Sequence, residues 1–150
     1  QACASPKWLF WYQTDKALQQ QFWQAVNVHL DNAFPKNERL VGGQFVCALG
    51  GKQVFYDNIC IVEAPRILGI EQSLIGIVGQ SQINAIKAIA DELPDNLQSM
   101  SAYGLNKENK IELACLSSVR QFSQLGQALN FDKVWDGIDL ASVFSKKISH

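Results

Sequence analysis

Residues 7–14 are KWLFWYQT, and this stretch predicts a β-strand that leads directly into a helix. Residues Lys7–Tyr12 are rich in aromatic side chains, which favour strands. Thr14 can cap the first free amides of a helix, and Asp15 suits the positive end of its dipole. The helix should end before Pro35, because a residue that precedes proline avoids the α region. Its apolar stripe at helical spacing consists of Leu18, Phe22, Ala25, Val26, His29 and Ala33.

A β-hairpin is predicted to follow this helix. Residues 39–49 are its first strand, and Gly42-Gly43 within that strand suggests a bulge. Gly50-Gly51 can form a two-residue turn, because glycine adopts positive φ without strain. Residues 52–63 are then the returning strand, which completes a strand–helix–strand–strand unit.

The same order of elements occurs a second time after a break at residues 64–69. The polar pair Gln80-Ser81 corresponds to Gln13-Thr14 at a strand-to-helix junction, with Ser81 as the helix cap. The second unit is predicted to contain a strand at 72–79, a helix at 83–93, and strands at 100–105 and 110–116 that flank a polar turn at 106–110.

These patterns predict one α+β domain made of two βαββ units, about 7–63 and about 72–116, related as a pseudo-repeat. Their strands should form a mainly antiparallel sheet packed by helices, because each unit ends in a hairpin. A C-terminal helical extension at about 118–147 should cover part of the sheet, since residues 119–144 are strongly apolar. A chain of 150 residues is long enough to bury such a core as a single domain.

Charge and hydropathy exclude two classes of partner. The net charge is −1 and the chain has no cluster of Lys and Arg, which argues against a nucleic-acid partner. No apolar run approaches the roughly 20 residues that a membrane-spanning helix needs. A protein partner or a small molecule remains.

The start of the chain indicates processing. Gln1-Ala2-Cys3 has no initiator Met, which suggests that a preceding segment was removed. If that segment was a secretory signal, the protein is periplasmic or extracellular, where disulfides form. Cys3 after Ala2 also fits a bacterial lipoprotein cleavage site, so a lipid anchor at Cys3 is one alternative. An artificial boundary of the expressed chain is another.

Four cysteines allow two disulfides in three pairings. We expect a Cys60–Cys115 bridge, because both residues fall near the same place in the last strand of their units, and then a Cys3–Cys47 bridge. Buried free thiols are the alternative, since free cysteine is among the most buried residue types. The cysteine and histidine spacings match no metal site, so neither a metal nor another cofactor is predicted.

The sequence contains no recognisable catalytic constellation. His29 is the only histidine away from the C-terminus, and at the border of an apolar stripe a packed histidine is more common than a general base. Residues 74–81 place glycines before the second helix but lack the lysine and the spacing of a phosphate-binding loop. The carboxylates form no pair that can be assigned to two sides of a cleft.

Aromatic residues are the main candidates for a binding surface. Trp11 and Tyr12 lie on opposite faces of the first strand, so either face could meet a partner. Tyr56, Asp57 and Asn58 interrupt the apolar run of the returning strand and are assigned to the same surface. The alternative is that the aromatic residues pack in the core.

These observations favour an exported binding protein that acts through a protein–protein interface, as an inhibitor, an immunity protein or an assembly protein. One alternative is a small-molecule-binding domain, with aromatic side chains that line a groove between the two βαββ units. A thiol- or carboxylate-dependent enzyme is a further alternative with less support, because no base is placed beside a nucleophile.

Overall fold

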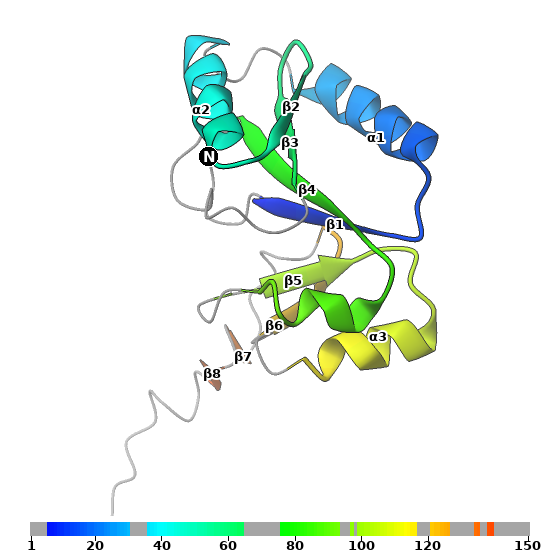
Figure 1. Cartoon of the computed structure of the whole chain (residues 1–150). Helices are drawn as coiled ribbons and strands as arrows, with labels where there is room; N and C mark the ends of the chain where they lie inside the picture. Colours follow the sequence, from blue (N-terminus) through cyan, green and yellow to red (C-terminus); the bar gives the residue numbers. More distant parts are fainter. Residues whose placement is uncertain are drawn as a thin grey trace, which may run out of the picture. The chain divides into compact units, whose positions relative to one another are not determined.

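Figure 1 shows the strands and helices, coloured by their order along the chain. The computed structural model describes residues 6–30, 36–64, 76–93, 97, 99–116, 121–126, 134–135 and 138–139. The chain divides into two units, Gln1–Glu92 and Leu93–His150, and each is described by itself. The first unit contains β1 (Trp8–Tyr12), α1 (Lys16–His29), α2 (Lys36–Ala48), β2 (Lys52–Phe55), β3 (Cys60–Glu63), β4 (Ile77–Ile83) and a short 3₁₀ helix, η2 (Ile86–Ile89).

A four-stranded mixed sheet with the strand order β1-β4-β3-β2 forms the centre of the first unit. β4 lies between β1 and β3 and is parallel to both, with Leu9 opposite Gln80 and Ile61 opposite Val78. β2 is the edge strand and is antiparallel to β3. The α+β class is therefore confirmed. The prediction of a mainly antiparallel sheet is wrong, because both ladders of β4 are parallel.

The first strand and helix form where the sequence predicts them, but α1 is rotated relative to the predicted stripe. Its buried residues are Gln19 and Trp23, whereas Leu18 and Phe22 are 54% and 41% exposed. The cap is Asp15 rather than Thr14, since the Asp15 carboxylate accepts from the Leu18 N–H at 2.7 Å. The predicted end of this helix at Phe34-Pro35 lies outside the described residues.

α2 takes the place of the first strand of the predicted hairpin. The strand expected at 39–49 and its bulge at Gly42-Gly43 are wrong, because these residues belong to a helix. Both glycines are buried, and a Cβ added to Gly43 would overlap the side-chain amide of Gln53 and lie 3.2 Å from Cys60 Sγ. Close packing of α2 on the sheet therefore outweighs the low helix propensity of glycine, about 1 kcal/mol per residue.

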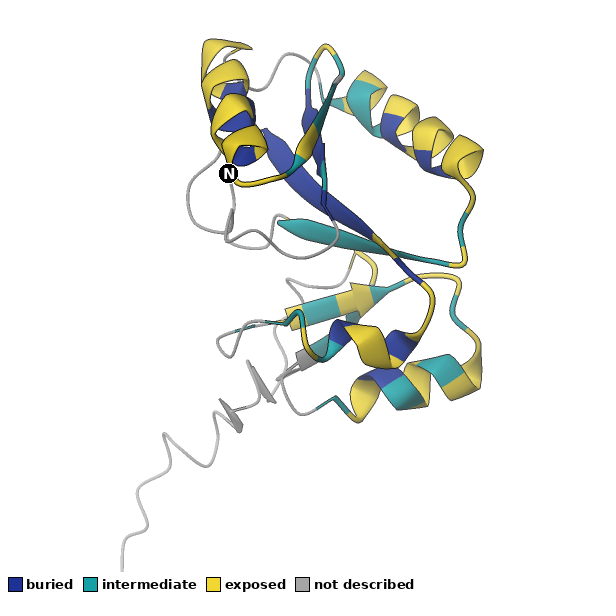
Figure 2. Cartoon of the chain, viewed as in Figure 1, coloured by how far each residue is buried: buried dark blue, intermediate teal, exposed yellow. Residues whose placement is uncertain are grey.

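The two faces of the sheet have separate hydrophobic cores, because successive strand residues point to opposite faces. On the α1 face, Trp23 packs with Ile59, Ile61 and Val78. On the α2 face, a second cluster surrounds the Cys60 side chain. The buried residues are concentrated in β3 and β4 (Figure 2). The second cluster contains Val46, Cys60, Val62 and Ile77.

The returning strand predicted at 52–63 is itself a hairpin. β2 and β3 pair antiparallel, and the turn between them closes with the Tyr56 N–H donating to the Ile59 carbonyl at 2.9 Å. Gly50 has a φ of 94°, which suits glycine, but it lies in the turn between α2 and β2 rather than between two strands. The Tyr56-Asp57-Asn58 segment is thus a turn between two strands.

β4 continues through the predicted junction Gln80-Ser81. Ser81 is a buried strand residue rather than a helix cap, since its hydroxyl donates to the Ala64 carbonyl at 2.7 Å and accepts from Trp8 Nε1 at 3.0 Å. The helix predicted at 83–93 is wrong except for η2. Residues 72–75 of the predicted strand lie outside the described residues.

The second unit contains β5 and β6, which pair parallel, and a short antiparallel pair, β7 and β8. The strand predicted at 100–105 is confirmed in part by β5. The strand predicted at 110–116 is wrong, because α3 occupies it; its cap is Asn106, whose side chain accepts from the Asn109 N–H at 2.8 Å. The bounds are β5 (Ser99–Ala102), α3 (Lys107–Ala114), β6 (Gln121–Gln124), β7 (Val134–Trp135) and β8 (Ile138–Asp139).

The pseudo-repeat and the C-terminal helical extension are not confirmed. The two predicted βαββ units do not match element by element, since each predicted hairpin has a helix in place of one strand. Within the extension expected at 118–147, residues 121–124 form a strand, and most of the remaining residues lie outside the described part of the chain. The organisation as a single domain stays a prediction.

Candidate functional site

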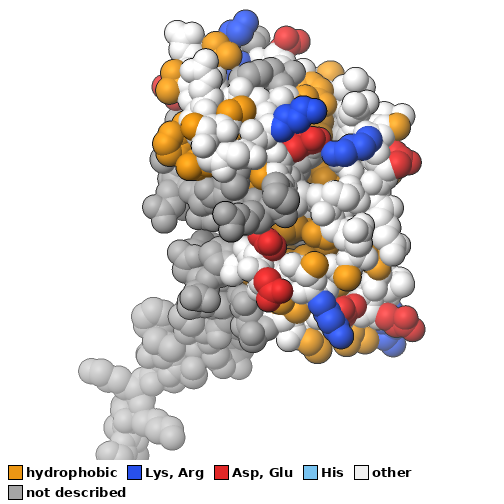
Figure 3. Space-filling view, viewed as in Figure 1, with side chains coloured by type: hydrophobic (Ala, Val, Ile, Leu, Met, Phe, Trp, Pro, Cys, Tyr) orange, Lys and Arg blue, Asp and Glu red, His pale blue; other side chains and the backbone are white. Residues whose placement is uncertain are grey.

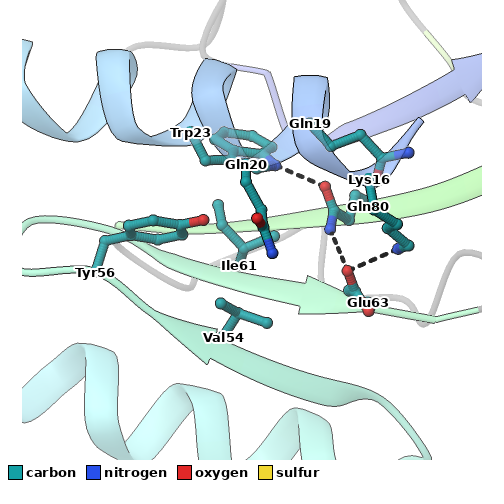
Figure 4. Close-up of a pocket in the computed structure, with 9 residues that line it drawn as sticks. All are labelled: Lys16, Gln19, Gln20, Trp23, Val54, Tyr56, Ile61, Glu63 and Gln80. Atoms are coloured by element: carbon teal, nitrogen blue, oxygen red, sulfur yellow. Dashed lines mark hydrogen bonds and ion pairs between the residues drawn. The ribbon is translucent and has the colours of Figure 1, made fainter. Parts of the chain in front are cut away.

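A polar network on the α1 face of the sheet surrounds the side chain of Gln80 (Figure 4). The Gln80 carbonyl Oε1 accepts from the indole N–H of Trp11 at 2.7 Å and of Trp23 at 2.6 Å. Its Nε2 donates to Glu63 Oε1 at 2.9 Å, and Lys16 Nζ donates to the same oxygen at 2.9 Å. We call these five residues the Gln80 network. It joins α1 to three strands of the sheet.

The position of this network follows from the order of the elements. Glu63 is the last residue of β3, and Lys16 is the first residue of α1, which follows β1. The network therefore lies toward the carboxyl ends of the parallel strands, where open α/β sheets usually bind their ligands.

The cavity beside the network is small, with a volume of about 60 Å³. A water molecule occupies roughly 30 Å³ in the liquid, so this space suits water rather than an organic ligand. Gln19 contributes a buried Oε1 that has no hydrogen-bond partner, while its Nε2 donates to the Thr14 carbonyl at 3.1 Å. The described lining residues are Lys16, Gln19, Gln20, Trp23, Val54, Tyr56, Ile61, Glu63 and Gln80.

The chemistry of this cavity is that of hydrogen bonding. Glu63 is held by a lysine and an amide, and no cysteine, serine or histidine is among the described lining residues. Burial and, second, the Glu63 carboxylate raise the pKa of Tyr56 above its ordinary value, so its hydroxyl stays protonated at neutral pH. The Gln80 network thus fastens α1 to the sheet, and it places no acid–base pair.

Trp11 and Tyr12, two of the predicted binding residues, are both partly buried. Trp11 packs against the core beneath α1, edge-to-face with Phe22 and Trp23, at ring-centroid distances of 5.3 and 6.4 Å. Tyr12 is the last residue of β1 and pairs with Ile83. The structure therefore places Trp11 within the Gln80 network, a role that depends on a partner 69 residues away.

The other three predicted binding residues form the turn between β2 and β3. Asn58 is fixed to the end of α1, with its N–H donating to Asn27 Oδ1 at 2.7 Å and its Nδ2 donating to the Asn27 carbonyl at 3.1 Å. Asp57 is exposed, and Tyr56 is partly buried. The hydrogen bonds to Asn27 hold this turn against the end of α1, which suits a recognition element.

A second, larger cavity of about 320 Å³ lies next to this turn. Its described lining residues are Lys36, Arg39 and Leu40 of α2, together with Tyr56 and Asp57 of the turn. We call it the Arg39 cavity. The sequence analysis assigned Tyr56 and Asp57 but missed the two cations, because it placed Arg39 at the start of a strand. Charged residues just after Pro35 were the available signal of a helix start.

The outer face of α2 is apolar. Val41 and Phe45 are 68% and 61% exposed and lie four residues apart on one side of α2, and Leu49, which is 48% exposed, follows directly after the helix. Figure 3 shows hydrophobic side chains grouped over α2. This face was missed because residues 39–49 were assigned to a strand rather than to a helix.

The cysteines do not form the predicted disulfides, since Cys47, Cys60 and Cys115 are free thiols, and Cys3 lies outside the described residues. Cys60 is fully buried in the cluster beneath α2. Burial, followed by the nearby Cys47, raises the pKa of Cys60 to about 11, although Arg39 lowers it in part. Cys60 is therefore an unreactive core thiol at neutral pH.

Within the described residues, no group of three or more His, Cys, Asp or Glu side chains is placed to hold a metal ion. None of the described helices has the length and hydropathy needed to cross a membrane.

Comparison with known proteins does not assign the chain to a family. A scan against protein-family models, a search of curated proteins and a search of solved structures each find no significant match.

Proposed function

We propose that this chain is a binding protein that recognises a protein partner through the outer face of α2, formed by Val41, Phe45 and Leu49. The supporting observation is the exposure of these three large apolar side chains, two on one side of α2 and the third directly after its last residue, Ala48. Contiguous apolar surface of this kind is common at protein–protein interfaces. Covering these side chains would remove further apolar surface from water, which is favourable by about 25 cal/mol per Å².

The chemistry of the partner surface follows from the charge of this helix. Residues 40–51 contain no charged side chain, so the face of α2 offers nothing to a charged partner. The partner should present an apolar groove or patch, and its binding should change little with salt concentration. An inhibitor, an immunity protein or an assembly protein would use such a surface, and we retain these roles within the proposal.

The expected location in the periplasm or outside the cell stays a prediction. Because Cys47, Cys60 and Cys115 are free thiols, the expected disulfides no longer support this location. The α2 proposal does not depend on the compartment.

Photo-crosslinking tests this proposal. We would place p-benzoylphenylalanine at position 45 and, as the control, at position 18 on α1, where Leu18 is 54% exposed, compared with 61% for Phe45. A protein crosslinked only from position 45 would be purified and its affinity measured at low and high salt. We expect Val41→Ser to weaken that binding about tenfold, with little effect of salt.

Two results would overturn the proposal. Equal crosslinking from positions 18 and 45 would show that α2 has no special role. Crosslinking from position 45 to a second copy of this chain, with a dimer in sedimentation velocity, would make the face a self-association surface instead.

The alternative of a small-molecule-binding domain has one specific observation in its favour, the Arg39 cavity. Its described lining residues all belong to the first unit. A groove between two βαββ units stays a prediction.

A further inference from the structure

The Arg39 cavity contains a buried cation without a matching anion. Arg39 is only 5% exposed, and its Nη1 has no hydrogen-bond partner. The one ion pair among the described residues joins Lys16 and Glu63, so Arg39 takes part in none there. A buried guanidinium is costly unless hydrogen bonds and a counter-charge compensate for its lost hydration. An acceptor with negative charge would complete this site.

The surroundings of Arg39 supply further donors. Lys36 and Arg39 are in the first turn of α2, a helix of 13 residues, where free backbone N–H groups and the helix dipole favour an anion. A guanidinium and an ammonium on one cavity are donors that typically bind an oxyanion.

We propose that the Arg39 cavity binds the oxyanion of a small organic molecule, a carboxylate or a phosphate, with Arg39 as its principal contact. The volume of about 320 Å³ is at the lower end of the range for ligand pockets, which suits a small metabolite. This site is separate from the apolar side chains on the outer face of α2, so either proposal can fail without the other.

Asp57 determines which oxyanion the cavity prefers. It is exposed and lines the cavity opposite two cations, which leaves a formal charge of +1 from the three side chains. A singly charged anion, or an anion whose own ammonium group reaches Asp57, balances this set better than a polyanion.

Titration of the full chain with inorganic phosphate and, separately, with acetate tests the proposal. Backbone amide shifts would be followed by NMR, with sodium chloride at equal ionic strength as the reference. We expect saturable shifts confined to residues 36–40 and 56–57, with dissociation constants in the millimolar range. A stronger response to phosphate than to acetate would identify a tetrahedral anion as the ligand, and the reverse order a carboxylate.

Variants then assign the residues. We expect Arg39→Met to abolish the saturable shifts, Lys36→Gln to weaken binding about fivefold and Asp57→Asn to strengthen phosphate binding about twofold. Lys87→Gln, which removes an exposed lysine of η2, is the control and should change nothing. Lys36 is exposed, so Lys36→Gln remains informative even if Arg39→Met does not fold.

The proposal is overturned if neither anion causes shifts beyond those of sodium chloride. It is equally overturned if Lys87→Gln and Lys36→Gln weaken binding to the same extent, because the anion would then respond to overall charge rather than to this cavity.

Discussion

The two faces of the sheet in the first unit hold their helices in different ways. On the α1 face, the side-chain amide of Gln80 has partners for both its oxygen and its nitrogen, and these join α1 to β1, β3 and β4. On the α2 face, contact depends on a small apolar cluster around Val46, and two buried donors, Arg39 Nη1 and Gln53 Nε2, have no partner, compared with one buried acceptor, Gln19 Oε1, on the α1 face. The polar interactions that stabilise this unit are thus mainly on the α1 face of the sheet.

This contrast separates the structural and functional parts of the unit. Buried polar groups with all partners in place rigidify a core, whereas unpaired ones often mark a ligand or a functional strain. The Gln80 network joins α1 to the sheet and Trp23 of α1 is buried, while α2 leaves Phe45 and its neighbours exposed. We therefore assign stability mainly to α1 and recognition to α2.

The largest effect is expected for Gln80→Ala. This change leaves the N–H groups of Trp11 and Trp23 without their acceptor and removes one of the two donors to Glu63, whose other donor is Lys16. An unsatisfied buried group costs about 1–3 kcal/mol, so the free energy of unfolding should fall by about 4 kcal/mol in urea denaturation. Gln20→Ala, an exposed control on α1, should cost less than about 0.5 kcal/mol. Equal losses would contradict a structural role for the network.

The next largest effect on stability is expected for Gly79→Ala. A Cβ at Gly79 would overlap the ring of Trp8, which is itself fixed by its hydrogen bond to Ser81, so overpacking should cost about 3 kcal/mol. At Gly43 the overlapping group is the flexible end of Gln53, and alanine also gains helix propensity. Thermal denaturation should therefore show a smaller loss for Gly43→Ala, about 1 kcal/mol or less. A larger loss of stability for Gly43→Ala than for Gly79→Ala would contradict the distinction between rigid packing at Trp8 and adaptable packing at Gln53.

Arg39→Met tests the difference between the two faces of the sheet, because it removes an unpaired cation from the α2 face. Replacing a poorly paired buried charge by an apolar side chain of similar volume is often neutral or stabilising. In buffer without phosphate or carboxylates, the free energy of unfolding should therefore stay within about 1 kcal/mol of the wild type or rise. A loss as large as that of Gln80→Ala would show that Arg39 has a structural partner.

The smallest effect is expected for Lys16→Ala. The Lys16–Glu63 ion pair has a largely exposed lysine, and Gln80 still donates to Glu63 when the lysine is absent. Exposed ion pairs contribute about 0.5 kcal/mol or less, and salt screens them further. Urea denaturation at low and at high salt should show a difference that nearly vanishes at high salt. A loss above about 2 kcal/mol would mean that Lys16 belongs to the buried part of the network.

The start of the fold was predictable because its signals are local. The aromatic run at 8–12 forms β1, and the polar residues after it start α1 within one residue of the predicted cap. The rotation of α1 was not predictable, since Gln19 replaces Leu18 on the buried side through hydrogen bonds to Thr14 and Gln82. No local pattern shows that a glutamine has a partner 63 residues away.

Both hairpins were predicted incorrectly because the same local residue types occur in two kinds of structure. Residues 39–49 contain glycines together with branched and aromatic residues, a composition that favours a strand, but close packing against Gln53 and Cys60 favours a helix. At Asn106 the polar residues that suggested a turn are the cap of α3. Turn and cap signals use the same residue types, so the sequence alone does not separate them.

The candidate site was predictable only in part for a related reason. Tyr56 and Asp57 stood out because they interrupt an apolar run, and they do line the Arg39 cavity. Arg39 and Lys36 join them only because α2 runs back along β2, which depends on the helix that was missed. The exposed face around Phe45 depends on the same helix.

The most direct test of the division between α1 and α2 is the affinity of Phe45→Ser for the protein crosslinked from position 45, measured by calorimetry. Phe45 is 61% exposed, so the variant should unfold like the wild type. We predict binding at least about tenfold weaker, a loss of about 1.4 kcal/mol, with Leu18→Ser unchanged. Unchanged affinity in Phe45→Ser, with the fold intact, would contradict the assignment of recognition to α2.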